Sequence, residues 1–369
     1  MKSTALVAFL IFLKLGVFSQ PNQGTFDTKE NKPGVIFYPD KNWAYHENKE
    51  EYGWNTDKLN KLTDFVRDST HATGLVIIQS GKILVDYGDI EELSYIASCR
   101  KSILSLLYGK YVENGTINLN KTLEELHIDD VGGLLPSEKK ATIYDLLKSK
   151  SGVFHPAGNE GGNEFLFPPR GSKKPNTYFV YNNWDFNAAG FIFEQETGLS
   201  IYQAFDNDIA KKIGLEDWDI SKQFKDGDSS KSMFKAYHFL FSTRDMARIG
   251  YLALRNGKWK EQQIVPQAWV KRMTSITTGL EEMKTVDPQI KNWPWYKWGY
   301  GLMWRIWDSP EQLPELTNAY TATGNMGQYI TILPALDMVI ALKTKSDYGR
   351  RTGYDVYDKL LTKIIEAKK

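Results

Sequence analysis

A serine and a lysine three residues apart, Ser98 and Lys101, are the residues of this chain best suited to chemistry. On a helix, residues i and i+3 lie on one face, so the hydroxyl and the amine can reach hydrogen-bonding distance. A serine hydroxyl becomes a good nucleophile only when a nearby base takes its proton. A lysine that is partly stripped of water, or placed beside other cations, can lose its own proton near neutral pH and act as that base. The pair therefore predicts nucleophilic catalysis by Ser98.

The same Ser-x-x-Lys spacing occurs at Ser137 and at Ser232, so the surrounding sequence has to separate the three. Ser137 follows glycines and a proline in a stretch typical of a turn, and Ser232 ends a polar run typical of a solvated loop. Only Ser98 is followed by apolar residues at helical spacing, which predicts a helix that ends at an Asn-Gly pair. The alternative is that Ser98 only caps this helix and that Lys101 is exposed.

Two later stretches hold groups that such a nucleophile would need. Tyr181 and Asn183 lie in a predicted loop just before a helix. A phenol held among cations loses its proton more easily and can relay a proton to a leaving group, and the amide can bind the lysine or a substrate. Thr323, Gly324 and Asn325 precede a predicted strand, where glycine lets another backbone approach closely and an amide N–H can face a developing oxyanion. The alternative is that both stretches are structural. Tyr181 would then be a buried tyrosine beside a capping asparagine, and residues 323–325 would be the entry to a hairpin.

Elements from both ends of the chain must meet to position these residues. Amphipathic helices are predicted over 55–69 and 352–366. Between about 98 and 270 the pattern is mainly helical. The predicted strands are 74–80, 81–87, 298–307, 328–333 and 338–344. The fold class that follows is α+β, with an antiparallel sheet flanked by the N- and C-terminal helices and an inserted, mainly helical lobe.

Length and composition fit an ordinary globular chain with two lobes. The chain has 369 residues, of which 41% are hydrophobic and 25% charged. We predict one domain over 51–369, with a sheet lobe of about 51–97 and 298–369 and a helical lobe of about 98–297. The net charge of +1 gives no argument for binding nucleic acid or an anionic membrane surface.

The N-terminal residues differ from the rest. Lys2 precedes an apolar run over 5–13 with small residues after it, which predicts a secretory signal peptide over 1–19 and an extended arm over 20–50. The run is short for a bilayer span, and an uncleaved membrane-associated segment is the alternative. We therefore expect an exported bacterial protein, periplasmic or secreted, with no stable membrane insertion once the signal is removed.

Other chemistries find little support in the sequence. The five histidines are scattered without metal-ligand spacing, and neither a Gly-x-Ser-x-Gly elbow nor a phosphate-binding glycine pattern occurs. We expect no metal and no cofactor. Cys99 is the only cysteine; it cannot form an intramolecular disulfide, and we interpret it as a buried structural residue rather than the nucleophile.

Taken together, these stretches resemble the serine β-lactamase and penicillin-binding-protein superfamily, most closely its class C β-lactamase, esterase and D-peptidase branch. The resemblance covers roughly residues 55–365, and the segments 141–152 and 241–250 also look like stretches of that family. The three motifs that carry it are Ser98-Cys-Arg-Lys for Ser-x-x-Lys, Tyr181-Asn-Asn for Tyr-x-Asn, and Thr323-Gly for Lys/His-Thr-Gly without its first residue.

The departure from the family pattern is Ala322. Many members have a Lys or His there that helps to hold a substrate carboxylate, so its absence argues against efficient cleavage of β-lactams or peptidoglycan. The Ala-x-Gly-x-x-Gly-Gln form looks more like the 6-aminohexanoate-dimer hydrolase group, which act on small linear amides and esters. Loops such as 155–178 and 280–297 are expected to set the shape of the cleft.

The resemblance implies a serine hydrolase that works through an acyl-enzyme on a small ester, amide or short peptide. Ser98 would attack the carbonyl with Lys101 and Tyr181 as base, and Asn183 would orient Lys101 or the substrate. The backbone N–H groups of Ser98 and Asn325 would hold the oxyanion. The alternatives are a β-lactamase, a D-Ala-D-Ala carboxypeptidase or D-aminopeptidase, and a non-hydrolytic protein that binds cell-wall fragments.

Overall fold

The computed structural model describes residues 36–309, 311, 313–346 and 349–369. The predicted signal peptide, and the predicted arm as far as residue 35, lie outside these residues. The described part of the arm packs against the domain: Trp43 is 8% exposed, and Arg248 donates hydrogen bonds to the carbonyls of Asp40 and Lys41. Within the described residues, no helix is both long and apolar enough to cross a membrane.

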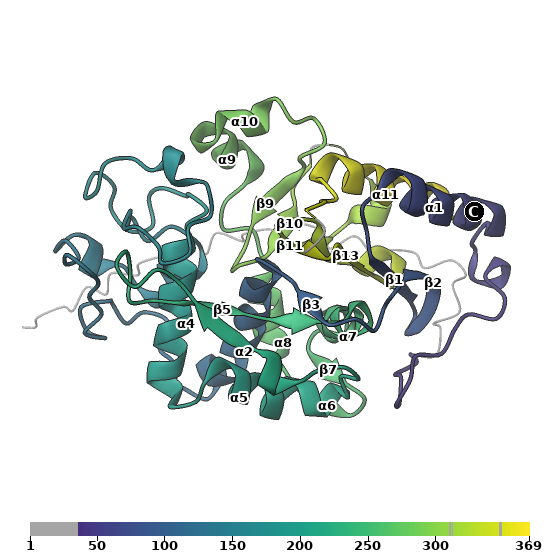
Figure 1. Cartoon of the computed structure of the whole chain (residues 1–369), viewed down its shortest axis with the longest axis horizontal. Helices are drawn as coiled ribbons and strands as arrows, with labels where there is room; N and C mark the ends of the chain where they lie inside the picture. The colour runs from purple at the N-terminus through teal and green to yellow at the C-terminus, as the bar shows by residue number, and fades with distance from the viewer. Residues whose placement is uncertain (1–35, 310, 312, 347–348) are drawn as a thin grey trace, which may run out of the picture. The chain divides into compact units, whose positions relative to one another are not determined.

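A seven-stranded antiparallel sheet joins the two ends of the domain, as the sequence predicted (Figure 1). Its strand order is β2-β1-β13-β12-β11-β10-β9, so the N-terminal hairpin adds to strands from the C-terminal part of the chain. The strands are β1 (Gly74–Gln79), β2 (Lys82–Gly88), β9 (Trp298–Tyr300), β10 (Arg305–Trp307), β11 (Tyr320–Gly324), β12 (Gln328–Leu333) and β13 (Met338–Lys343).

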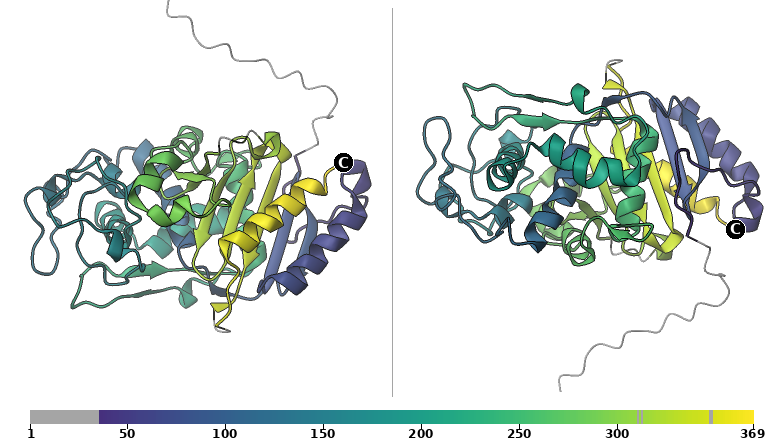
Figure 2. Two further views of the ribbon diagram at one scale, coloured as in Figure 1. Left: turned by 90° about the horizontal axis from the view of Figure 1, so that it is seen from above. Right: turned by 90° about the horizontal axis from the view of Figure 1, so that it is seen from below.

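Helices cover both faces of this sheet. On one face lie α1 (Thr56–Ser69) and α11 (Tyr354–Glu366), side by side in Figure 2, and Tyr357 of α11 stacks on Tyr329 with ring centroids 3.7 Å apart. On the other face lies α7 (Thr243–Leu254). Because side chains alternate along a strand, β12 presents Tyr329 to α11 and Ile330 to α7.

The position of α7 differs from the predicted lobe boundary, which placed 98–297 in a separate helical lobe. Gly250 brings α7 so close to the sheet that a Cβ atom there would lie 2.5 Å from Val339 and 2.8 Å from Ile330. The buried residues of β12 and β13 need an apolar cover on this face, and α7 supplies it.

The structure also corrects the strand that we predicted over 298–307. We predicted one strand there, but the chain forms the hairpin β9–β10, in which Gly301 donates a backbone hydrogen bond to Trp304. Two serines of the central helix hold this turn: Ser102 donates to the carbonyl of Met303 and Ser105 to that of Leu302. The alternating aromatic residues predict strand conformation but do not show where the strand reverses.

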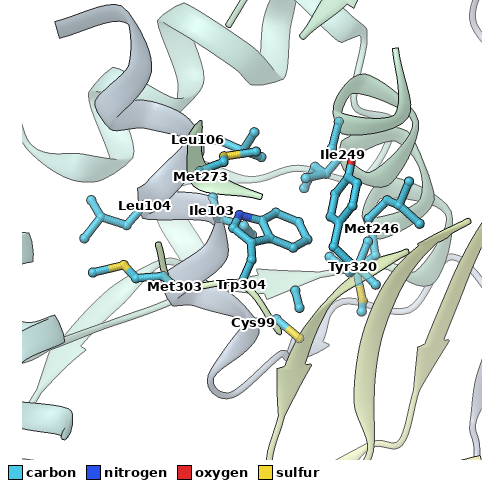
Figure 3. Close-up of a cluster of buried hydrophobic side chains, with 14 of the residues drawn as sticks. Cys99, Ile103, Leu104, Leu106, Met246, Ile249, Met273, Met303, Trp304 and Tyr320 are labelled. Carbon is cyan, nitrogen blue, oxygen red and sulfur yellow. The ribbon is translucent and has the colours of Figure 1, made fainter. Parts of the chain in front are cut away.

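The remaining residues form a mainly helical region around the central helix α2 (Cys99–Glu113), which is buried along almost its whole length. Its Cys99 and Ile103 pack with Trp304 and Tyr320 of the sheet side and with Met246 and Ile249 of α7 (Figure 3). The other α-helices and short strands of this region are α3 (Ile143–Leu147), α4 (Asn183–Thr197), α5 (Ile201–Phe205), α6 (Lys211–Ile213), α8 (Gln267–Met273), α9 (Leu280–Val286), α10 (Pro288–Lys291), β3 (Ser94–Tyr95), β4 (Phe224–Asp226), β5 (Ala236–His238), β6 (Leu240–Phe241), β7 (Lys258–Trp259) and β8 (Gln262–Gln263). The central helix α2 (Cys99–Glu113) thus connects the sheet to the helical region.

Candidate active site

Ser98 lies at the junction between β3 and α2. The preceding Ala97 has φ +49°, a conformation that costs energy for a residue with a side chain and that turns the chain sharply into the helix. Ser98 occupies the N-cap position of α2, but its side chain makes no capping hydrogen bond. The alternative that Ser98 only caps the helix is therefore wrong, since its hydroxyl is directed to another partner.

That partner is Lys101, which is 1% exposed. Its Nζ lies 2.9 Å from Ser98 Oγ, 2.7 Å from the Tyr181 hydroxyl and 2.6 Å from Asn183 Oδ1. The structure thus brings together four of the seven predicted site residues around one amine. The alternative of an exposed Lys101 is wrong.

The surroundings of Lys101 favour the uncharged amine. Burial lowers its pKa well below the ordinary value, and the nearby guanidinium groups of Arg100 and Arg305 lower that pKa further. Within the described residues no carboxylate pairs with Lys101. An uncharged amine has two N–H groups and one lone pair, so one of its three partners must donate a hydrogen bond to it. Asn183 Oδ1 cannot donate, and the donor is therefore Ser98 or Tyr181.

Asn183 is held in one orientation by the backbone. Its Nδ2 donates to the carbonyl of Asn159 at 2.8 Å, so its Oδ1 faces Lys101 and can only accept. The neighbouring Asn182 caps α4, because its side chain accepts from the N–H of Trp184 at 3.0 Å. This cap fixes the beginning of α4 and with it the positions of Tyr181 and Asn183.

The pKa of the Tyr181 phenol differs from what the sequence led us to expect. We expected cations to make its proton easier to lose, but burial raises its pKa to about 12, outweighing the lowering effect of Arg305 and of the hydrogen bond from Ser98. Tyr181 therefore keeps its proton at neutral pH. It can pass a proton on, whereas the role of base falls to Lys101.

The end of β11 forms the other side of the site. A Cβ atom on Gly324 would lie 2.4 Å from the carbonyl oxygen of Ile96 and 3.1 Å from Cβ of Ala97, so only glycine lets this strand approach the turn before Ser98. Within the described residues, the backbone N–H groups of Ser98 and Asn325 make no hydrogen bond. Both can therefore donate to a substrate oxygen, which the predicted oxyanion role requires.

We expect Gly324→Ala to damage both stability and activity. The added methyl group must push β11 away from the turn at Ala97, and such overpacking costs about 1–3 kcal/mol of unfolding free energy. Denaturant unfolding measures the first effect and ester turnover the second. Gly279→Ala is a matched control, because Gly279 has φ −73° and a Cβ atom there meets only Asp308 Oδ2, at 3.3 Å, within 4 Å. A Gly324→Ala protein as stable and active as Gly279→Ala would contradict this packing argument.

A cleft of about 280 Å³ opens beside Ser98. Both loops that we expected to shape it contribute to its walls. The described residues that line it are Ser98, Gly161, Asn163, Leu166, Phe179, Val180, Tyr181, Met283, Val286, Asp287, Ile290, Trp293, Tyr296, Arg305, Thr323, Asn325 and Tyr354. The volume and the mixed apolar and polar walls suit a small organic molecule with a few fixed polar groups.

Sequence reasoning missed Arg305 and Tyr354 in this cleft. The sequence around Arg305 reads only as an aromatic strand, and Tyr354 lies at the beginning of an amphipathic helix. Neither position matches a motif, because their proximity depends on the pairing of β10 with β11 and on the docking of α11. One sequence signal existed, namely a lone arginine in a strand of aromatic residues.

The other candidates for a nucleophile or a metal site have structural roles or are not assembled into a site. Ser232 donates to buried Asp130, as a structural residue would. Cys99 is fully buried with its thiol 3.5 Å from the carbonyl of Gln328, and burial raises its pKa, which confirms the structural interpretation. In the described part of the chain, no three His, Cys, Asp or Glu side chains gather where they could hold a metal ion.

The chain belongs to the Beta-lactamase family, whose model matches residues 62–362. It is 22% identical over 293 residues to an uncharacterized protein of Alkalihalophilus pseudofirmus, a match that covers 71% of this chain and 76% of that protein.

Solved structures share this fold. A Bacillus anthracis protein provisionally assigned as a 6-aminohexanoate-dimer hydrolase has a TM-score of 0.63 at 20% identity, covering 89% of both chains. The octameric penicillin-binding protein homologue of Pyrococcus abyssi has a TM-score of 0.61 at 18% identity, covering 84% of this chain and 78% of that one. A class C β-lactamase mutant has a TM-score of 0.59 at 15% identity, covering 87% and 99%. The chain thus has the serine hydrolase fold of the family, as its motifs implied.

Proposed function

We propose that this protein is a serine hydrolase that cleaves a small ester or linear amide through an acyl-enzyme on Ser98. The observation that carries the proposal is the contact of one buried amine, Lys101 Nζ, with the Ser98 and Tyr181 hydroxyls at 2.9 and 2.7 Å. A purely structural lysine would be expected to find a carboxylate or the solvent instead.

In the proposed reaction, Ser98 Oγ bonds to the substrate carbonyl carbon while Lys101 Nζ takes the hydroxyl proton. The negative charge on the carbonyl oxygen is held by the N–H groups of Ser98 and Asn325. When the bond to the leaving group breaks, Tyr181 gives its proton to the leaving atom and is reprotonated from Lys101. Water then attacks the acyl-enzyme with Lys101 again as base, and Ser98 recovers its proton.

The position of Ala322 bears on the substrate. It is 1% exposed on β11, where it packs in the core and offers no charge to the cleft. This supports small linear esters and amides over β-lactams. It is also in keeping with the fold likeness to the Bacillus anthracis protein, although at 20% identity that likeness is to the fold alone. We also propose that the protein is exported, because the apolar run over 5–13 is typical of a signal peptide. We further propose that neither nucleic acid nor a metal takes part in the reaction.

Intact-protein mass spectrometry after exposure to a fluorophosphonate and, separately, to a penicillin tests this proposal. A fluorophosphonate adduct on Ser98 without a penicillin adduct is the expected result. A penicillin adduct would instead favour a β-lactamase or a cell-wall peptidase. No adduct from either reagent on a folded protein would favour the non-hydrolytic binding protein.

We expect Tyr181→Phe to lower kcat by about 100-fold, because the variant lacks the proton that the leaving group needs. KM should change little, since the aromatic ring stays beside Phe186 and Tyr300. Steady-state kinetics with an amide substrate measure the effect. An activated ester should suffer less, because its leaving group departs without a proton. An equal loss on both substrates would contradict the role of proton donor.

A further inference from the structure

Arg100 is a buried arginine whose charge no carboxylate neutralises. The residue is 2% exposed, and its guanidinium lies over the ring of Tyr237, 4.4 Å from the centroid. Its Nη2 donates to Asn187 Oδ1 at 2.8 Å, whereas its Nη1 has no hydrogen-bond partner within the described residues. In the same part of the chain, no carboxylate forms an ion pair with it. The charge is therefore buried, incompletely hydrogen-bonded and uncompensated.

The stability of the fold does not account for this charge. A buried cation without a counter-ion gives up hydration that nothing replaces. Arg100 also lies in the first turn of α2, where the helix dipole disfavours a cation. Arg248 of α7 is equally buried, but it pairs with Glu216 at 2.8 Å and donates to three backbone carbonyls, as a structural arginine would. The role of Arg100 is therefore better sought in its position beside Lys101.

Two asparagines of α4 hold the two cationic side chains next to each other. Asn183 Oδ1 accepts from Lys101 Nζ at 2.6 Å, and Asn187 Oδ1 accepts from Arg100 Nη2 at 2.8 Å. The asparagines are four residues apart on one helix, so their Cβ atoms lie on the same face, roughly 5–6 Å apart. An amide oxygen orients a cation without neutralising it. The guanidinium and the amine are thus fixed side by side with the positive charge left in place.

We propose that Arg100 is a positioning residue of the reaction, held by Asn187 as a fixed positive charge that keeps the amine of Lys101 uncharged and able to take the Ser98 proton. The inference rests on the proposed function, because it concerns the base of that reaction. Two like charges held this close in a buried setting repel each other, which favours the loss of a proton. The lysine is the group that loses it, because a guanidinium stays charged.

The other titratable groups around Arg100 do not compensate its charge. Burial lowers the pKa of His238 to about 4, so this imidazole is uncharged at neutral pH. Of the carboxylates that act on this cluster, Glu194 pairs with Lys225 and Asp226 is exposed. Burial raises the pKa of three tyrosines, which therefore keep their protons: Tyr95 of β3, Tyr202 of α5 and Tyr237 of β5.

The groups around Lys101 leave one other positive charge beside it. Burial raises the pKa of the Tyr181 phenol and of the Cys99 thiol, so both keep their protons. Arg305, which lines the cleft, also lowers the pKa of the amine. Because this second charge remains when Arg100 is replaced, we expect the pKa of Lys101 to rise without returning to the ordinary lysine value.

The pH dependence of kcat/KM tests this proposal. Arg100→Met removes the charge and should move the midpoint of the acid limb up by roughly 1–2 pH units, so that activity lost at neutral pH returns in alkaline solution. Asn187→Asp should move the midpoint in the same direction, because the new carboxylate pairs with Arg100. Arg100→Lys keeps the charge and should keep the midpoint near the wild-type value. An unmoved midpoint in Arg100→Met, or an equal upward shift in Arg100→Lys, would overturn the proposal.

Arg248→Met is the control for the loss of a buried arginine as such. It should unfold at a lower denaturant concentration than the wild type, because its pair with Glu216 is broken, and its acid limb should stay in place. Arg100→Met should be at least as stable as the wild type, since it removes an unpaired buried charge. A loss of activity at every pH in Arg100→Met, with the midpoint in place, would show a purely structural role and overturn the proposal.

A titration of Lys101 itself separates this proposal from the proposed function, because it does not depend on turnover. In protein carrying ¹³C at the lysine Cε, the NMR signal of Lys101 is identified by its absence from Lys101→Met, and its pH dependence gives the pKa. That pKa should rise by roughly 1–2 pH units in Arg100→Met. If it rises but no ester or amide is hydrolysed, the effect of Arg100 on the amine stands and the proposed function fails. If it does not rise, the proposal fails whether or not the protein is active.

Discussion

Replacing Ser98 with alanine is expected to lower kcat for every ester and amide that the wild type hydrolyses by at least ~1,000-fold. The variant has no oxygen to bond to the substrate carbonyl, and the amine of Lys101 beside it is a poor substitute. The covalent adduct with a fluorophosphonate should also disappear. The fold should survive, because the Ser98 side chain caps nothing and serves no partner except the site itself.

The chain supplies its own control for this experiment. Ser137 belongs to a second Ser-x-x-Lys sequence, and its side chain likewise makes no capping hydrogen bond. Ser137→Ala should keep wild-type turnover and wild-type labelling. Full activity of Ser98→Ala on all substrates, or loss of activity in Ser137→Ala, would remove Ser98 from the centre of the mechanism.

The second large effect concerns Lys101. Lys101→Met keeps the length of the side chain but has no amine, and we expect kcat/KM to fall by about 100- to 10,000-fold. Lys101→Arg should be equally poor, because a guanidinium stays charged and cannot accept the serine proton. Lys140→Met, at the corresponding position of the second Ser-x-x-Lys sequence, should be harmless, since Lys140 is exposed. Activity retained by Lys101→Met would transfer the role of base to another residue.

The pH dependence provides a separate signature of the same amine. The base must be uncharged, so activity is lost as the pH falls through its pKa and is retained above it. Because burial, Arg100 and Arg305 lower the pKa of Lys101, the midpoint of this acid limb should lie well below the ordinary lysine value. Tyr181, whose pKa is raised to about 12, should add no loss on the alkaline side until that range. The acid limb should be missing from the residual activity of Lys101→Met.

Local sequence predicted much of the site because much of it is local. Ser98 and Lys101 are one helical turn apart, so a single apolar helix is enough to align them. Asn183 likewise lies next to the cap that begins α4. In each case a short stretch carries both the chemical group and the conformation that presents it.

Tertiary structure decided what depends on distant segments. The raised pKa of Tyr181 reflects how completely the phenol is buried, which no count of nearby cations in the sequence could show. The turn between β9 and β10 is fixed by Ser102 and Ser105, about 200 residues earlier in the chain. The cover of α7 on the sheet likewise depends on a close approach at Gly250.

The sequence by itself predicted the proposed nucleophile, its proposed base and the family fold, because these follow from spacings within single elements and from ordered motifs. Only the tertiary structure placed Arg305 beside Thr323, because that proximity arises from the pairing of β10 with β11 and from the docking of α11. Desolvation and charge act through space between segments far apart in the chain. They are therefore set by packing, and packing is what decides which substrate the cleft can hold.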